Sequence, residues 1–305
     1  MPLLLSYPGL RSILEHLEAV KRAHIIARSP GLQKINKLIP LCLKDLCINS
    51  NDMTINKLWI TCDKDGVNFA MNRKIFIRQS AESQEDKMKK LINFYICGRS
   101  IIHVGRLSWD TDFLPVDLKL RVNSLSVFSH WEFEAAIPSI DPRSFPLKTM
   151  ITRPETSNFD DQIVQLAETL ILHVVTHRIV SVEDLKKLNN KTVVFEDFSS
   201  SRVDIIPLIK YHIETKKDIG TTFVIPTDCN TDKYSINEML YEFEQAFGDF
   251  RCDLDDVNER FIPGSYKFSI PINNESRIQV YAIEDPEKDG RWKIVIRPVS
   301  EVSGL

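Results

Sequence analysis

The histidines His173 and His177 have the H-x-x-x-H spacing that brings two zinc ligands onto one turn of a helix. A zinc peptidase of that type also needs a glutamate directly after the first histidine, and Val174 stands at that position. The run ILHVVTHRIV is rich in β-branched residues, which favour a strand over a helix. We therefore expect no metal here and interpret both imidazoles as polar side chains on a strand.

The residues Asp228, Asn230 and Asp232 are similar to the opening of a calcium loop. Such a loop needs glycine at its sixth position, because glycine makes the sharp turn at little cost, and a bidentate glutamate at its twelfth. Lys233 and Met239 occupy those two positions. We interpret the polar residues as a capped turn before a helix.

Three of the six cysteines lie close together in the sequence, at Cys42, Cys47 and Cys62. A tetrahedral zinc site needs four ligands, usually in close pairs, and none of these spacings is C-x-x-C. Buried structural thiols are therefore the expectation.

The sequence contains no motif that indicates catalysis. The acidic run DLDD at 253–256 lacks a paired base or a phosphate-binding loop. The patterns G-x-S-x-G, G-x-G-x-x-G and G-x-x-x-x-G-K-[ST] do not occur, and the chain has only 10 glycines to let a backbone approach a phosphate. We expect a protein that is not an enzyme and that has no cofactor.

Composition agrees with a globular chain that binds neither nucleic acid nor membrane. Of 305 residues, 43% are hydrophobic and 27% charged, and 39 basic residues face 42 acidic ones. No stretch approaches the ~20 apolar residues of a membrane span. The apolar run at 1–5 is shorter than the core of a signal peptide, so we expect reduced cysteines and an intracellular protein, in the cytoplasm or nucleus.

The elements that must carry any function begin with helices. Leu10, Ile13, Leu14 and Leu17 fall at i, i+3, i+4 and i+7, which predicts one apolar stripe of an amphipathic helix. A second helix is predicted over 20–28 and a third from Pro30, where proline suits the first helical turn. Residues 8–39 are therefore a compact group of two or three helices.

Strands and one helix follow. The segments 41–48 and 57–63 have strand patterns, 67–79 predicts a hairpin, and 84–98 predicts a helix. From residue 100, short apolar runs start at 101, 118, 145, 170, 191 and 221, with helix or loop between them. The last five starts are separated by 27, 25, 21 and 30 residues. This spacing predicts parallel strands and indicates an irregular leucine-rich-repeat-like α/β solenoid. A non-repetitive α/β domain is the alternative.

The C-terminal part changes character again. A helix is predicted at 235–247, and the runs SYKFSIPI, SRIQVYAI and RWKIVIRPV then predict a closing antiparallel β segment. The fold class expected overall is α/β, with a short N-terminal helical module, the repeat-like body and this β-meander.

The run SYPGLRSILEHLEAVKRAHIIARSPGLQKINKLIPL closely resembles the N-terminal signature of a nematode family labelled F-box C proteins. The segments FLPVDLKLRVNSLSVF at 113–128 and SIDPRSFPLKTMITR at 139–153 resemble the repeat-like body of the same family. Tyr7-Pro8 stands where an F-box has Leu-Pro, and no tryptophan follows Arg28, where many F-boxes have one.

The resemblance implies a division into an F-box-like module at 1–40, a hairpin and helix at 41–99, and the body at 100–305. It also implies that the module binds a Skp1-type adaptor of a cullin-based ubiquitin ligase, while the body captures an unknown protein target. The adaptor-binding residues it implies are Pro8, Leu10, Ile13, Leu14 and Leu17. The alternative is a stand-alone binding module in which the helices only cap the solenoid.

Overall fold

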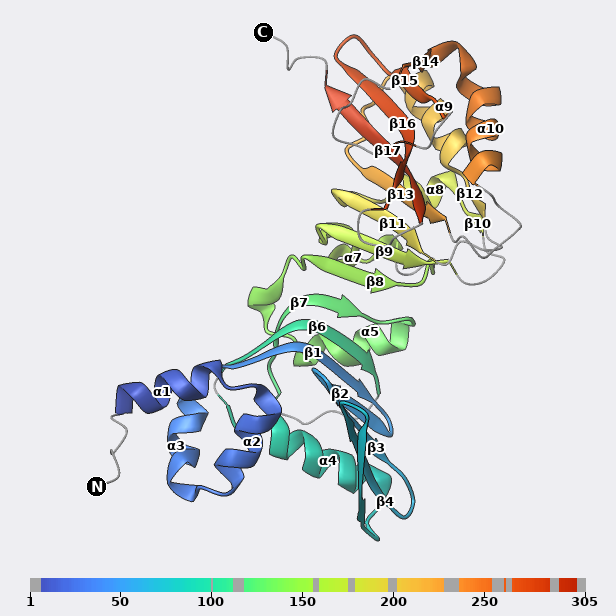
Figure 1. Ribbon diagram of the computed structural model, residues 1–305. Coiled ribbons are helices and arrows are strands. Elements are labelled where there is room, and N and C mark those ends of the chain that lie inside the picture. Colours follow the sequence, from blue (N-terminus) through green and yellow to red (C-terminus); the bar gives the residue numbers. More distant parts are fainter. Residues whose placement is uncertain are drawn as a thin grey trace. The chain divides into compact units, whose positions relative to one another are not determined.

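A computed structural model describes residues 7–99, 101–111, 118–155, 159–174, 179–196, 202–227, 236–253, 261, 265–285 and 291–300. The chain forms two compact units, residues 1–147 and 148–305. Figure 1 shows helices and strands in both. The expected division at residues 40 and 99 stays a prediction.

The first unit begins with three short helices, α1 (Tyr7–His16), α2 (Ala19–Ala27) and α3 (Pro30–Leu38). The carboxylate of Glu18 caps α2 by accepting the backbone N–H groups of Val20 and Lys21 at 3.0 and 3.1 Å. Pro30 occupies the first turn of α3, as predicted. The N-terminal helical segment is thus confirmed.

One sheet organises the rest of this unit, in the order β7-β6-β1-β2-β3-β4-β5. The strands β1, β6 and β7 run parallel, and β1 to β5 form an antiparallel meander. The elements are β1 (Leu41–Asn49), β2 (Asp52–Ile55), β3 (Leu58–Cys62), β4 (Gly66–Met71), β5 (Lys74–Gln79), α4 (Gln84–Tyr95), β6 (Ile102–Asp110), β7 (Arg121–Ser126), α5 (His130–Ala136), η1 (Ile137–Ser139) and η2 (Pro142–Ser144).

Gly105 allows β6 to approach β1 closely. A Cβ atom at this position would lie 2.6 Å from the carbonyl oxygen of Lys44, which is closer than packed atoms allow. The register of the two strands also skips this pair, since Leu43 pairs with Val104 and Asp45 with Arg106.

The second unit contains four parallel strands in the order β8 (Thr149–Thr152), β9 (Thr169–His173), β11 (Thr192–Glu196) and β13 (Thr222–Thr227). Each strand begins with a threonine, and the four threonines are in register. The next residue of each strand, from Met150 to Phe223, is buried. The parallel pairing predicted from the spacing is confirmed within this unit and within the first.

Helices and two short strands fill the connections between these strands. They are α7 (Gln162–Leu166), β10 (Ile179–Val180), α8 (Val182–Leu185), β12 (Arg202–Val203) and α9 (Ile205–Thr215), and β10 pairs parallel with β12. Buried leucines on α8 and α9, Leu185 and Leu208, add to the core of the unit.

Antiparallel strands complete the second unit. After α10 (Ile236–Phe247) and η3 (Gly248–Phe250) come β14 (Arg251–Cys252), β15 (Lys267–Pro271), β16 (Ser276–Glu284) and β17 (Trp292–Ser300). The order β13-β17-β16-β15-β14 is antiparallel throughout. The mixed α/β class and the C-terminal antiparallel strands are therefore confirmed. The described strands of each unit form an open arrangement, and no leucine-rich-repeat-like solenoid is identified in the described residues.

Candidate functional site

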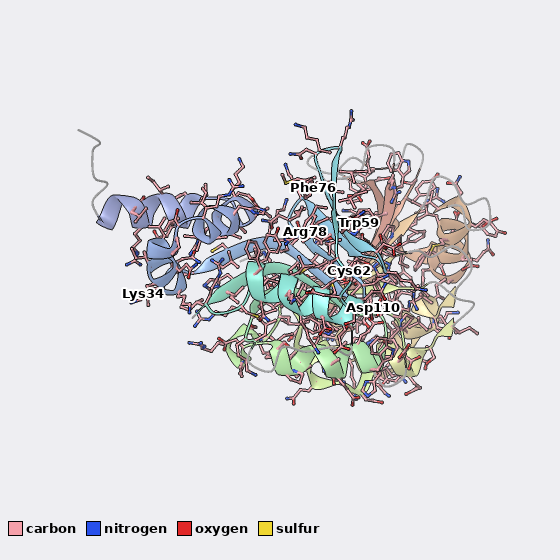
Figure 2. All side chains as sticks on the ribbon, turned by 90° about the horizontal axis from the view of Figure 1, so that it is seen from below. Lys34, Trp59, Cys62, Phe76, Arg78 and Asp110 are labelled. Carbon is pink, nitrogen blue, oxygen red and sulfur yellow. The ribbon has the colours of Figure 1, made fainter. Side chains whose placement is uncertain are left out.

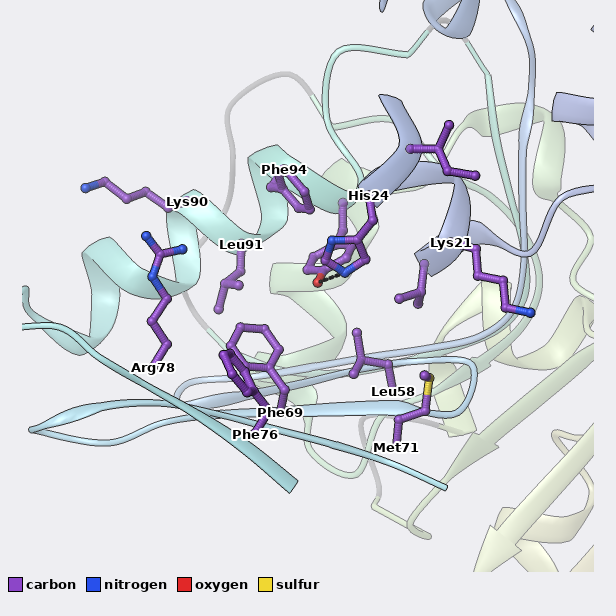
Figure 3. A pocket seen from close by; sticks show the side chains of 13 residues that line it. Lys21, His24, Leu58, Phe69, Met71, Phe76, Arg78, Lys90, Leu91 and Phe94 are labelled. Atoms are coloured by element: carbon purple, nitrogen blue, oxygen red, sulfur yellow. Dashed lines mark hydrogen bonds between the residues drawn. The ribbon is translucent and has the colours of Figure 1, made fainter. Parts of the chain in front are cut away.

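An apolar groove lies in the first unit, between the helices α2 and α4 and the strands β3 to β5 (Figure 3). Its volume is about 750 Å³. The residues that line it are mostly aliphatic or aromatic: Val20, Lys21, His24, Ile25, Leu58, Phe69, Met71, Phe76, Arg78, Lys90, Leu91, Phe94 and Tyr95. A groove of this size and lining suits an apolar ligand or peptide side chains.

The floor of the groove is the sheet end formed by β4 and β5. Asn72 and Arg73 both have positive φ, of 50° and 65°, as a two-residue type I′ hairpin turn requires. This turn sets the register in which Phe69 pairs with Phe76, with ring centroids 6.2 Å apart. Alternate residues of each strand therefore face the groove, and two aromatic rings cover its floor.

The wall consists of side chains from α2 and α4. Phe94 packs edge-on to Tyr95 at 4.8 Å, and the ring of His24 lies 5.8 Å from that of Phe94. The Tyr95 hydroxyl lies 3.3 Å from Nε2 of His24, and burial raises the pKa of Tyr95 to about 12. The tyrosine is thus a neutral hydrogen-bonding group at neutral pH.

The charges around the groove have one sign. Figure 3 shows Arg78 and Lys90 at one end and Lys21 at the other. Lys90 forms an ion pair with Glu82 outside the groove, whereas Lys21 and Arg78 have no ion-pair partner among the described residues. None of the described residues that line the groove is acidic. The site combines apolar walls with a basic rim, which favours an acidic, apolar ligand.

The predicted adaptor-binding residues do not form one stripe. Leu14 is 2% exposed and packs with Ile26 and Ile39 in the core of the helical segment. Leu10 packs partly against this core, whereas Ile13 is 48% exposed. Leu17 is half-buried and follows the end of α1 at His16.

The remaining predicted residue, Pro8, lies within α1, but its side chain is outside the described part. The structure therefore does not test the proposed contact of Pro8. The contacts of the other four residues with an adaptor stay a prediction as well.

Of the candidate metal ligands, His173 is described and His177 is not. Nε2 of His173 lies 3.5 Å from Oε2 of Glu196 on the adjacent strand β11. Residues 228–235 and 254–260 lie outside the described residues, so the candidate calcium loop and most of the acidic run are not placed. Within the described ranges, no group of three or more His, Cys, Asp or Glu residues could hold a metal ion.

The prediction that the three cysteines are buried is wrong for two of them. Cys62 is fully buried, but Cys42 is exposed and Cys47 half-buried. The reason is strand alternation along β1, since the side chains of Leu41 and Leu43 point into the protein core and that of Cys42 points away from it.

No helix in the described ranges is long and apolar enough to cross a membrane.

Sequence reasoning placed the hairpin at 67–79 but missed the groove. The available signal was the run Ile75-Phe76-Ile77, because three consecutive apolar residues leave a strand without a polar face. The part of the wall that α2 forms could not be found in this way, because α2 lies about fifty residues before β5 in the chain.

Part of the chain matches a known protein family. A family model described as "Domain of unknown function (DUF3557)" matches residues 84–228, which is less than half of the 305 residues. No curated protein and no solved structure matches the chain. The matched segment begins at the start of α4, so one wall of the groove lies inside it, while α1–α3 and β1–β5 lie outside it.

Proposed function

We propose that this chain is a non-catalytic, intracellular protein-interaction protein, an F-box-type adaptor that recruits a target protein to a cullin-based ubiquitin ligase. The observation that carries the proposal is the packing of α1–α3. Leu14, Ile26 and Ile39 give these helices a core of their own, and Leu10, Leu32 and Ile35 pack against it.

Apolar side chains also remain on the outside of this helical segment. Ile13 on α1 is 48% exposed, and Leu38 on α3 is 67% exposed. A helical segment that satisfies its own core and still exposes large aliphatic residues has the properties of a docking module. We assign the Skp1-type adaptor to this surface, with Ile13 as an anchor.

The target-binding part of the proposal is a repeat-like body. Its support is the register of β8, β9, β11 and β13. Each of these strands begins with a threonine and then alternates buried and half-buried residues. One face of these strands carries the half-buried residues Ile151, Ile171, Val194 and Val224 in a single row. In the proposal, this row contributes to target binding.

A second candidate function is a binding module in which the helices only cap the body. It is favoured by the bonds between α2 and the sheet of the first unit. Nδ2 of Asn56, in the turn after β2, donates to Oε1 of Glu18 at 3.0 Å, and Nη1 of Arg22 donates to the carbonyl of Pro40 at 2.8 Å. These bonds hold the helices on the strands whether or not an adaptor binds.

The experiment that separates the two candidates uses the neighbouring residues Ile13 and Leu14 in the full-length chain. Ile13→Asp places a charge on an exposed position, so the fold should survive and binding to a purified Skp1-type adaptor should be lost. Leu14→Asp buries an unpaired charge, so the protein should unfold at a lower temperature. Ser12→Asp, also exposed on α1, is the matched control for added charge.

Binding is measured by isothermal titration calorimetry and folding by circular dichroism. A folded Ile13→Asp variant that still binds the adaptor, or a wild-type chain that does not bind it, contradicts the adaptor proposal. A folded wild-type chain that does not bind the adaptor supports the capping function.

A further inference from the structure

The strand β5 is the edge strand at one end of the described sheet. In the described part of the chain, it pairs with β4 on one side and with no strand on the other. All six of its residues are exposed. The three central ones, Ile75, Phe76 and Ile77, are 73%, 66% and 65% exposed. Natural sheets rarely leave such an edge open, because it pairs readily with another strand.

The backbone groups that point to this open edge can be identified. The N–H of Ser80 donates to the carbonyl of Asp65 at 3.1 Å, so residues 65 and 80 form a hydrogen-bonded pair. Such pairs alternate along an antiparallel ladder, and Arg78, Phe76 and Lys74 are therefore the residues bonded to β4. Ile75, Ile77 and Gln79 direct their N–H and C=O groups outward.

Both faces of the sheet are apolar next to this edge. Phe76 lies on the face that forms the groove floor, beside Phe69. Ile75 lies on the opposite face, in the row of Ala70 and the half-exposed Trp59. Figure 2 shows Trp59, Phe76 and Arg78 in this part of the molecule. A strand added to β5 would cover apolar side chains on both faces while it satisfied the free backbone groups.

The charge of the strand decides which occupant fits. β5 carries Lys74 and Arg78 and no acidic residue, and Arg73 precedes it in the turn. Pairing with β5 of a second copy would bring like charges onto neighbouring strands, which is destabilising. A segment with acidic residues would instead pair with Arg78, which has no ion-pair partner among the described residues.

We infer that the open edge of β5 binds an extended segment of a partner protein in which apolar and acidic residues alternate. The segment adds to the sheet as an antiparallel or parallel strand and bonds to Ile75, Ile77 and Gln79. Its acidic residues lie on the face of Arg78, and its apolar residues lie on the opposite face, beside Ile75 and Ile77. This inference uses from the proposed function only that the chain binds proteins. Its test contains no ligase adaptor, so the two can fail separately.

The test measures binding of a synthetic probe to the full-length chain by fluorescence anisotropy. The probe is a short fluorescein-labelled peptide in which valine and aspartate alternate. One control peptide has lysine in place of aspartate. A second has every other amide N-methylated, which removes its edge hydrogen bonds. We expect the aspartate peptide to bind, and both control peptides to bind at least about tenfold more weakly, since 1.4 kcal/mol corresponds to a tenfold change.

Variants of β5 test the site itself. Ile77→Pro removes an N–H that points to the open edge and leaves the bonds to β4 in place, so the Kd of the aspartate peptide should rise about tenfold. Ile77→Thr keeps the N–H and the strand propensity, and should lose less affinity than Ile77→Pro. Arg78→Glu should reverse the preference, so that the lysine peptide binds more tightly than the aspartate peptide.

Circular dichroism checks the fold of each variant. If Ile77→Pro is unfolded, Arg78→Glu and the N-methylated peptide carry the test. Failure of the aspartate peptide to bind, equal binding of the lysine peptide to the wild type, or an unchanged Kd in folded Ile77→Pro overturns the inference. Sedimentation that shows a wild-type dimer, dissociated by Ile77→Pro, also overturns it and makes a second copy the occupant.

Discussion

Nε of Arg22 donates to Oδ1 of Asn36 at 2.7 Å, and both side chains are buried within the N-terminal helical segment. The same guanidinium donates to the carbonyl oxygens of Asn36, Ile39 and Pro40 at 3.2, 2.8 and 2.8 Å. One side chain of α2 thus binds three carbonyl oxygens at and just after the C-terminal end of α3. Asn36 also accepts a hydrogen bond from Arg99 at 3.3 Å.

The first prediction follows from this arrangement. Arg22→Ala should lower the free energy of unfolding by about 3 kcal/mol, because it removes a buried side chain together with its hydrogen bonds to the carbonyl oxygens of Ile39 and Pro40. The measurement is urea unfolding followed by circular dichroism. Arg28→Ala is the matched control, since Arg28 is exposed and follows the same helix. Equal stability of the two variants would contradict the structural role assigned to Arg22.

A second buried polar side chain has the same task in the second unit. Nδ2 of Asn190 donates to the carbonyl oxygens of Val164 and Ala167 at 2.8 and 2.7 Å, at the end of α7. Asn190→Ala should lower the free energy of unfolding by about 1–3 kcal/mol, the usual effect of leaving buried polar groups unpaired. Asn189→Ala should change it little, because Asn189 is exposed. Thermal unfolding of the two variants side by side checks this, and a similar loss in both would refute it.

The buried side chains of Arg22 and Asn190 show what the sequence alone does not reveal. Periodicity located α1 to α4 and most of the strands, because alternation, caps and turn residues are local signals. It did not show that Arg22 and Asn190 are buried, since their acceptors are the ends of other helices. An isolated arginine or asparagine in a sequence is far more often exposed.

The predicted site illustrates the same limit. Leu10, Ile13, Leu14 and Leu17 have helical spacing, but α1 ends before Leu17 and only Leu14 reaches the core. The order of strands also depends on distant partners. β17 pairs directly with β13, with Phe223 opposite Ile296, and no local pattern predicts such a pairing. The groove was missed because it needs α2, α4 and β5 together.

Asp141 gives a prediction about pH. Its carboxylate accepts hydrogen bonds from Arg143 at 2.6 Å and from Arg121 at 3.4 Å, and these bonds, chiefly that of Arg143, hold the pKa of Asp141 well below the usual 3.8. A folded-state pKa below the unfolded value means that this contribution to stability is complete above pH 3.8. It is lost as the pH falls from there through the folded-state pKa.

We expect the Asp141 carboxyl carbon to titrate well below pH 3.8 in a carbon-13 NMR experiment. Arg143→Gln should raise the pKa of Asp141 towards the ordinary value, and Arg121→Gln should raise it less. A wild-type Asp141 that titrates like a free aspartate, or a larger rise in Arg121→Gln, would contradict this assignment.

The last prediction uses the contrast between two cysteines. Cys62, the last residue of β3, is fully buried, and burial raises the pKa of its thiol to about 11. Cys42 on β1 is exposed. Because the thiolate is the reactive form, iodoacetamide at pH 8 should alkylate Cys42 in the native protein and leave Cys62 unmodified. Mass spectrometry of tryptic peptides reports both sites, and labelling in urea is the control in which both should react. Modification of native Cys62 at the rate of Cys42 would show that β3 opens readily and would contradict the burial of this thiol in the native protein.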